Sequence, residues 1–225
     1  MKKVLFAVLV ISLVLVTFYI VWPTKDEESA ILPKSGVKGD RNVVVFLGDS
    51  ITAGYGLDRD LAFPSVIQKY WDENNISLRA VNSGVSGDTT GGVLYRLDSL
   101  LTNDVHMVFL EIGANDAFQK KDIGSIKENL IDIVRRIQEK DIEVALMAME
   151  IPLNISAADR EYAKRFANIY EEVGQECNVP VMGSLLAENE QNGELWLSDG
   201  IHPNDKGHLV IAKNVLKFLN PQWVY

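Results

Sequence analysis

Residues 43–50 read Val-Val-Val-Phe-Leu-Gly-Asp-Ser, a run of five apolar residues that ends in a glycine, an aspartate and a serine. A continuous apolar run of this length is typical of a strand that is buried on both faces. The polar residues that follow mark the point where such a strand leaves its sheet. This segment therefore predicts a buried strand with Ser50 presented at its carboxyl end.

Short apolar runs continue to alternate with amphipathic stretches along the rest of the chain. Further strands are predicted at residues 78–81, 105–112, 144–149 and 179–182, where Pro180 restricts the last to a strand start or an edge. A helix is predicted at 123–140. Strands alternating with helices predict a three-layer α/β/α sandwich with a five-stranded parallel sheet. Two more helical stripes are expected to be buried: Tyr162, Phe166, Ile169, Tyr170 and Val173, and Leu209, Ala212, Val215, Leu216 and Leu219.

Composition excludes several classes of protein. The chain has 225 residues, 47% hydrophobic and 24% charged, which is an ordinary globular mix for one main domain. The formal net charge of −9 argues against a nucleic-acid binder, which needs a basic face. The single cysteine, Cys177, excludes an intrachain disulfide and a cysteine-rich metal site. No motif indicates an obligate protein partner.

The N-terminus resembles a membrane anchor. Residues 4–22 carry no charge, and a helix of 19 residues is about 28 Å long, close to the thickness of a bilayer core. Lys2 and Lys3 precede this segment and acidic residues follow it, which predicts a cytoplasmic N-terminus and places the body of the chain outside the cytoplasm. Residues 1–22 are thus expected to be an anchor, 23–41 a linker and 42–225 one domain. A cleaved signal peptide, and with it secretion, is the alternative.

Four polar segments follow the predicted strands, at the edge where open α/β sheets bind ligands. Each segment alone also fits a helix cap or an ordinary turn. Together they offer a serine hydroxyl, the Gly87 N–H and the Asn115 amide as donors to an oxyanion, and an aspartate three residues before a histidine. The segments are Gly48-Asp49-Ser50, Ser86-Gly87-Asp88-Thr89, Gly113-Ala114-Asn115-Asp116 and Asp199-Gly200-Ile201-His202.

His202 differs from the other two histidines of the chain. His106 falls within a predicted strand and His208 within a predicted helix, where a packed or solvated ring is the default. His202 stands in a polar loop, and the spacing to Asp199 lets one carboxylate turn back onto the ring and fix its tautomer. This pair is the candidate for acid–base chemistry.

In order and spacing, these four segments resemble the four motif blocks of the SGNH (GDSL) hydrolases, over about residues 42–220. Within that family the chain looks most like the bacterial thioesterase I, arylesterase and lysophospholipase branch, except that Ala114 stands where many members have glycine. The resemblance implies that Ser50 is the nucleophile, His202 the general base and then acid, and Asp199 the residue that orients the histidine. It also implies an oxyanion hole formed by Ser50, Gly87 and Asn115, and no metal or organic cofactor.

The substrate is the least determined feature. Apolar residues in the loops after the strands are candidates for lining an acyl groove, although each also fits plain packing: Tyr55, Phe118, Pro152, Leu153 and Trp196. An apolar groove would suit fatty-acyl or aryl esters or thioesters, and a tether beside lipid would suit lysophospholipids. The alternatives are an O-acetyl esterase acting on cell-envelope polysaccharide and a silent, membrane-tethered binding module.

Overall fold

The computed structural model describes residues 30–32, 41–151, 157–186, 189 and 191–221. The predicted anchor at residues 1–22 and most of the linker lie outside the described residues, and so do Pro152 and Leu153. Within the described ranges, no helix has the length and apolar character needed to cross a membrane.

Five parallel strands form one sheet in the order β2-β1-β3-β4-β5. The five-stranded parallel sheet that the sequence predicts is therefore confirmed. Because the chain winds outward in both directions from β1, the point where the strand order reverses lies between β1 and β3. Loops at such a switch point diverge and leave a crevice for a ligand. The strands are β1 (Val43–Gly48), β2 (Arg79–Gly84), β3 (Val105–Glu111), β4 (Glu143–Met147) and β5 (Val181–Met182).

The strands depart from their predicted bounds, slightly in β3, which ends at Glu111 rather than 112, and more in β4, which spans Glu143–Met147 rather than 144–149. β2 runs to Gly84 rather than ending at residue 81, because its register with β1 continues through Asn82 and Ser83 until Gly84 meets Gly48. These polar residues are tolerated because β2 is an edge strand and only partly buried. β5 has only two residues, since Pro180 lacks the N–H that would extend the ladder.

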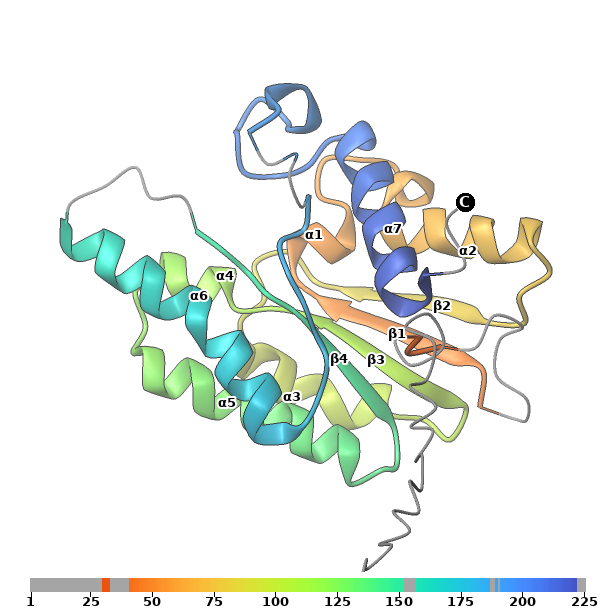
Figure 1. Ribbon diagram of the computed structural model, residues 1–225, viewed down its shortest axis with the longest axis horizontal. Coiled ribbons are helices and arrows are strands. Elements are labelled where there is room, and N and C mark those ends of the chain that lie inside the picture. The colour runs from red at the N-terminus through yellow and green to blue at the C-terminus, as the bar shows by residue number, and fades with distance from the viewer. Residues whose placement is uncertain (1–29, 33–40, 152–156, 187–188, 190, 222–225) are drawn as a thin grey trace, which may run out of the picture.

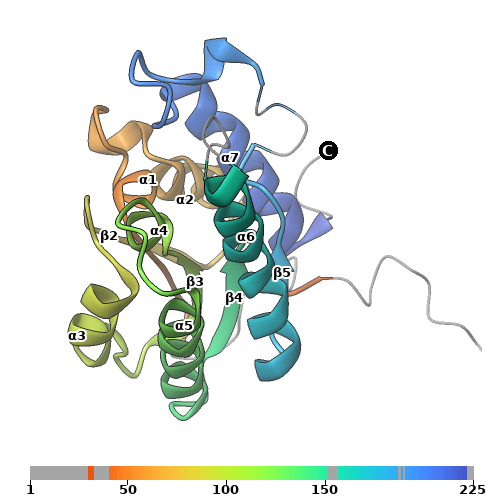
Figure 2. The ribbon, with the colours of Figure 1, turned by 90° about the vertical axis from the view of Figure 1, so that its left-hand side faces the viewer.

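Helices cover both faces of the sheet, which gives the expected three layers. Figure 1 shows α2 and α7 on one face and α3, α5 and α6 on the other, and Figure 2 shows the same layers from the side. Short 3₁₀ turns lie at Arg59–Leu61 and Gly193–Leu195. The α-helices are α1 (Ser50–Ala53), α2 (Phe63–Glu73), α3 (Thr90–Leu100), α4 (Ala114–Phe118), α5 (Ile123–Gln138), α6 (Ala157–Cys177) and α7 (Asp205–Leu219).

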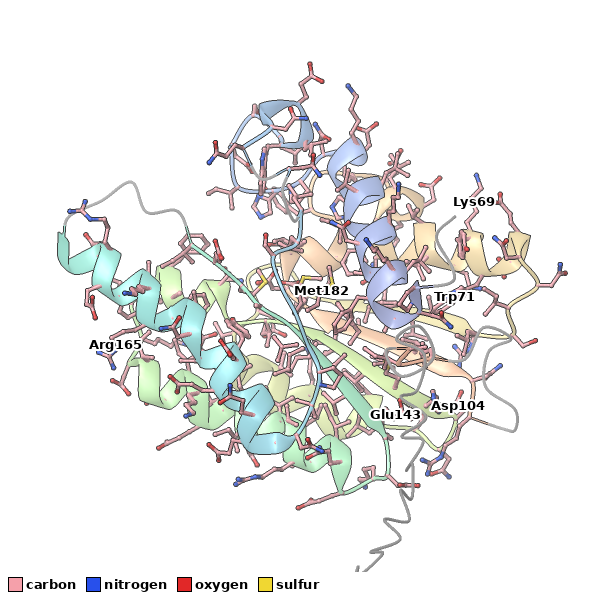
Figure 3. The ribbon with its side chains drawn as sticks, in the orientation of Figure 1. Lys69, Trp71, Asp104, Glu143, Arg165 and Met182 are labelled. Carbon is pink, nitrogen blue, oxygen red and sulfur yellow. The ribbon has the colours of Figure 1, made fainter. Side chains whose placement is uncertain are left out.

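The helical stripes form the core with two exceptions. Leu209, expected to be buried, is 56% exposed, because α7 instead turns His208 and Ile211 inward. Tyr162 of α6 is only partly buried, and its hydroxyl donates to the Lys121 carbonyl. In α2, Trp71 is fully buried, whereas Lys69 points outward in Figure 3.

Candidate active site

Ser50 stands at the junction between β1 and α1. β1 ends at Gly48, and Asp49 caps α1 by accepting a hydrogen bond from the Ile51 N–H at 3.1 Å. Ser50 is therefore the first residue of α1. Its own N–H belongs to the first turn, where a helix provides no backbone acceptor. The hydroxyl and this N–H are both available at the carboxyl edge of the sheet.

A closed turn carries the aspartate and the histidine. Trp196 and Pro203 form an isolated antiparallel bridge, and the Leu197 N–H donates to the His202 carbonyl at 2.8 Å. The chain therefore returns on itself between these residues, which places Asp199 beside the ring of His202. α7 begins directly after the turn, so the turn is held against one helical layer of the fold.

Ser50, His202 and Asp199 form one hydrogen-bonded chain. His202 Nε2 lies 3.0 Å from Ser50 Oγ, and His202 Nδ1 lies 2.7 Å from Asp199 Oδ2. Hydrogen bonds from the His202 N–H, the His202 ring and the Ile201 N–H lower the pKa of Asp199 to about 2. Asp199 is thus ionised at neutral pH and holds the ring proton on Nδ1, which leaves Nε2 to accept the Ser50 proton.

Two further donors come from neighbouring loops. Gly87, after β2, has a φ of +82°, a left-handed conformation suited to glycine, and its N–H has no acceptor among the described residues. Asn115, in α4 after β3, donates from Nδ2 to the Asp88 carbonyl at 2.9 Å and to Asp49 Oδ2 at 3.1 Å. The segments that follow β1, β2 and β3 thus each carry a hydrogen-bond donor, and Asn115 lines the same cavity as Ser50.

A cavity of about 820 Å³ opens beside Ser50 and His202. Its size is in the range of small-molecule sites. It follows the carboxyl edge of the sheet past the ends of β4 and β5, where Glu150, Ser184 and Gln191 contribute polar groups. A hydroxyl activated by a histidine, with backbone and amide donors beside an apolar cavity, is suited to acyl transfer. Its apolar wall is formed by Ile51, Ala114, Phe118, Ala148, Met149, Ile151, Leu185, Leu186, Trp196 and Ile201.

The profile of the GDSL-like Lipase/Acylhydrolase family matches residues 46–210. This range contains the candidate site residues Ser50, Gly87, Asn115, Asp199 and His202. The chain belongs to this family. It is therefore a GDSL (SGNH) serine hydrolase, a hydrolytic enzyme, and the family resemblance seen in the four sequence motifs is confirmed.

Relatives of this GDSL hydrolase carry esterase names. It is 29% identical to thioesterase 1/protease 1/lysophospholipase L1 of Escherichia coli (strain K12) over 80% of this chain and 84% of the relative. It is 30% identical to an arylesterase of Vibrio mimicus over 78% of this chain and 87% of the relative. The structure of the psychrotrophic esterase EstA from Pseudoalteromonas sp., inhibited by monoethylphosphonate, is similar with a TM-score of 0.75 at 28% identity, covering 81% and 98% of the two chains.

Two carboxyl groups of the GDSL hydrolase are buried behind Ser50. Asp49 and Glu111 are 1% and 0% exposed. Glu111 Oε2 accepts hydrogen bonds from the Asp49 N–H at 3.3 Å and from the Thr52 N–H and hydroxyl at 3.2 and 2.8 Å. Burial raises the pKa of Asp49 to about 6 and raises the pKa of Glu111 well above its usual range, where the charge of Asp49 adds to the effect. Glu111, the last residue of β3, therefore holds the first turn of α1 against the sheet.

The candidates for substrate contact divide into three groups. Phe118 and Trp196 line the cavity. Tyr55 is not among the lining residues; its ring instead lies on the His202 ring, with centroids 4.4 Å apart and planes at 36°. Pro152 and Leu153 lie outside the described residues.

The remaining histidines are placed away from the reacting groups. His208 is buried in α7 and its Nδ1 accepts the Phe63 N–H at 3.1 Å, and burial together with the charge of His202 lowers its pKa to about 4. His106 lies in β3, 3.8 Å from Glu143. Among the described residues, no group of three or more metal-ligating side chains is arranged to hold a metal ion.

Sequence reasoning missed Glu111 of this enzyme. A glutamate directly after the apolar run 107–110 was the available signal for Glu111, because an unpaired charge in a core is costly.

Proposed function

We propose that this GDSL hydrolase cleaves carboxylic esters or thioesters through an acyl-serine intermediate. The observation that supports this proposal is the hydrogen-bonded chain from Ser50 through His202 to Asp199, which opens onto an apolar cavity. The names of the relatives, which include esterase and thioesterase, agree with it.

The first half of the reaction forms the acyl-enzyme. Ser50 Oγ attacks the carbonyl carbon while His202 Nε2 takes the hydroxyl proton, and ionised Asp199 stabilises the imidazolium that results. The tetrahedral intermediate then collapses. The bond to the alcohol or thiol breaks, and the leaving group departs with the proton from His202 Nε2.

The oxyanion is held by donors from three loops. The Ser50 and Gly87 N–H groups are free to bind it. The Asn115 amide already donates to the Asp88 carbonyl and to Asp49, so it exchanges one of these hydrogen bonds for one to the oxyanion. Because the donors are positioned before the substrate binds, little reorganisation is needed during the reaction.

Water completes the cycle. A water molecule gives its proton to His202 Nε2 and attacks the acyl carbon, the same donors hold the second oxyanion, and Ser50 leaves with the proton. The product is a carboxylic acid, and the enzyme returns to its starting state.

The cavity indicates the class of acyl group. Its apolar wall extends from Ser50 to the ends of β4 and β5, which is more length than an acetyl group needs. Burial of each additional CH₂ group contributes about 0.8 kcal/mol. We therefore propose a preference for medium or long acyl chains.

Hydrolysis of p-nitrophenyl esters from acetyl to long-chain acyl by the purified chain tests this function, with Ser50→Ala as the control. We expect kcat/KM to rise with acyl length and activity to vanish in the variant. Activity confined to acetyl esters would favour the polysaccharide O-acetyl esterase instead. A folded protein with no turnover on any ester would favour the binding module.

We also propose that residues 4–22 anchor the enzyme in a membrane with the hydrolase domain outside the cytoplasm. The uncharged length of this segment and Lys2 and Lys3 before it support the proposal. Retention in the membrane fraction after an alkaline carbonate wash, and release when residues 1–22 are deleted, are the expected results. A soluble, N-terminally shortened product would instead indicate a cleaved signal peptide.

The contacts of Leu32 support a proposal for where such a tether would reach the domain. Leu32 is fully buried, and its N–H donates to the Leu219 carbonyl at the C-terminal end of α7, while α7 begins next to His202. A helix of 15 residues is about 22 Å long. A tether that reaches the domain at Leu32 therefore attaches at the end opposite Ser50, which favours substrates presented away from the anchoring bilayer.

A further inference from the structure

We propose that Arg96 is a positioning residue for the oxyanion hole, through an ion pair that ties the Gly87 loop to the end of β1. This inference rests on the proposed acyl-transfer function. Arg96 lies on α3, eight residues after Asp88, and is not among the residues that line the cavity.

Arg96 binds two segments at once. Its Nε donates to Asp88 Oδ2 at 2.8 Å, and its Nη2 donates to the Gly48 carbonyl at 3.2 Å. Gly48 is the last residue of β1, two positions before Ser50. The Arg96 and Asp88 side chains are 21% and 10% exposed, so water screens this pair less than a surface pair.

Asp88 transmits this restraint to the other donors. Its N–H donates to the Val85 carbonyl at 3.0 Å, which closes the turn that contains Gly87. Its own carbonyl accepts the Asn115 amide at 2.9 Å. Gly48 also accepts the Val85 N–H at 3.0 Å. The loops that supply all three proposed oxyanion donors are thus linked to one guanidinium.

The contact between the loop and α3 depends on a glycine. A Cβ atom on Gly92 would lie 1.8 Å from Asp88 Oδ1, a distance that no real side chain tolerates. Glycine at this position leaves room for the Asp88 carboxylate against α3, where it meets Arg96.

An ion pair that served stability alone would leave the chemistry intact, so the test separates the two roles. Arg96→Met removes both hydrogen bonds at similar side-chain length. We expect kcat on p-nitrophenyl butyrate to fall about 10- to 100-fold, less than the loss of an oxyanion donor itself, with KM within about threefold of wild type. The affinity for a trifluoromethyl ketone, which forms a tetrahedral oxyanion on serine, should fall by a similar factor.

Arg136→Met is the matched control. Arg136 also reaches α3 with one guanidinium, donating to Asp98 Oδ2 at 2.7 Å and to the Leu94 carbonyl at 3.4 Å, but it contacts no loop of the site. Its kcat and its ketone affinity should stay within about twofold of wild type. Urea unfolding of both variants compares their stabilities.

The outcomes are distinct. If Arg96→Met keeps wild-type kcat and ketone affinity, Arg96 is structural and the inference is wrong, while activity of the wild type leaves the proposed function in place. If Arg96→Met does not fold, Arg96→Lys is tested in its place. A single ammonium group cannot bind both Asp88 and the Gly48 carbonyl as the guanidinium does, so an undiminished kcat of Arg96→Lys overturns the inference. A wild type that neither hydrolyses esters nor reacts with a fluorophosphonate overturns the proposed function and this inference together.

Discussion

Asp199 and His202 are neighbours by sequence, whereas Ser50 meets the His202 ring from 152 positions away. The first contact needs only a turn in which one carboxylate accepts the backbone N–H groups of Ile201 and His202. The second contact depends on β1 and the start of α7 meeting at one edge of the sheet. The reacting groups therefore combine one local and one long-range geometry.

Removing either reacting group should abolish turnover. Ser50→Ala takes away the proposed nucleophile and His202→Ala the proposed base, and we expect each to lower kcat at least about 1,000-fold with no change in the urea unfolding midpoint. The double variant should lose about as much kcat as either single variant, because the two residues act as a unit. Wild-type rates in either single variant would contradict the assignment.

Tyr55 is expected to act through His202 rather than through the acyl chain. Its ring faces the imidazole, which becomes a cation in the proposed reaction, and an aromatic face stabilises a cation by about 0.5–1 kcal/mol at exposed sites. Tyr55→Leu should therefore lower kcat about two- to fivefold, equally for short and long acyl esters, while Tyr55→Phe keeps the rate.

A steady-state comparison across acyl lengths checks the Tyr55 prediction. Tyr95→Leu serves as the control, since Tyr95 is 96% exposed. If Tyr55→Leu raised KM for long chains alone, Tyr55 would instead contact the substrate.

At the scale of elements, α1 sits tightly against the ends of β1 and β2. A Cβ atom on Gly84 would lie 2.1 Å from the Ala53 N atom, and one on Gly48 would lie 2.2 Å from Thr52 Oγ1. The two glycines pair across the strands. Their missing side chains let α1, and with it Ser50, lie directly on the sheet.

Gly84→Ala should displace α1. We expect a loss of about 3 kcal/mol in the free energy of unfolding and a lowered kcat, because overpacking forces the backbone to shift. Gly193→Ala is the control, since nothing lies within 4 Å of its Cβ position. Urea unfolding and ester hydrolysis measure both effects; equal stability of the two variants would show that α1 accommodates the methyl group.

At the scale of the whole molecule, α7 and α2 are joined through a buried histidine. His208 Nδ1 accepts the Phe63 N–H, and the pKa of His208 is lowered from 6.5 to about 4 by burial. The unfolded chain therefore takes up this proton at higher pH than the folded chain does. The stability that His208 contributes is present above pH 6.5 and is lost as the pH falls towards 4.

His208→Asn should remove this pH dependence, because Asn Oδ1 can still accept the Phe63 N–H but does not titrate. Urea unfolding between pH 7 and pH 4 should show that wild type loses about 3 kcal/mol more than the variant. The difference between the two proteins is the informative quantity, since the raised pKa of Asp49 acts in the opposite direction over this range. Parallel pH profiles would contradict a neutral buried His208.

The sequence by itself determined the strands, the clearest helices and the identity of the candidate site residues, because apolar periodicity and turn chemistry are properties of neighbouring residues. It also placed the Asp199–His202 pair, whose spacing is local. The sequence wrongly predicted that Leu209 is buried. A helix can bury either of two adjacent faces, and the element that packs against it determines which one. Only the tertiary structure decided that Tyr55 lies on His202, that Glu111 supports α1 and that Arg96 joins the Gly87 loop to the end of β1, because these contacts depend on strand order and register between distant segments.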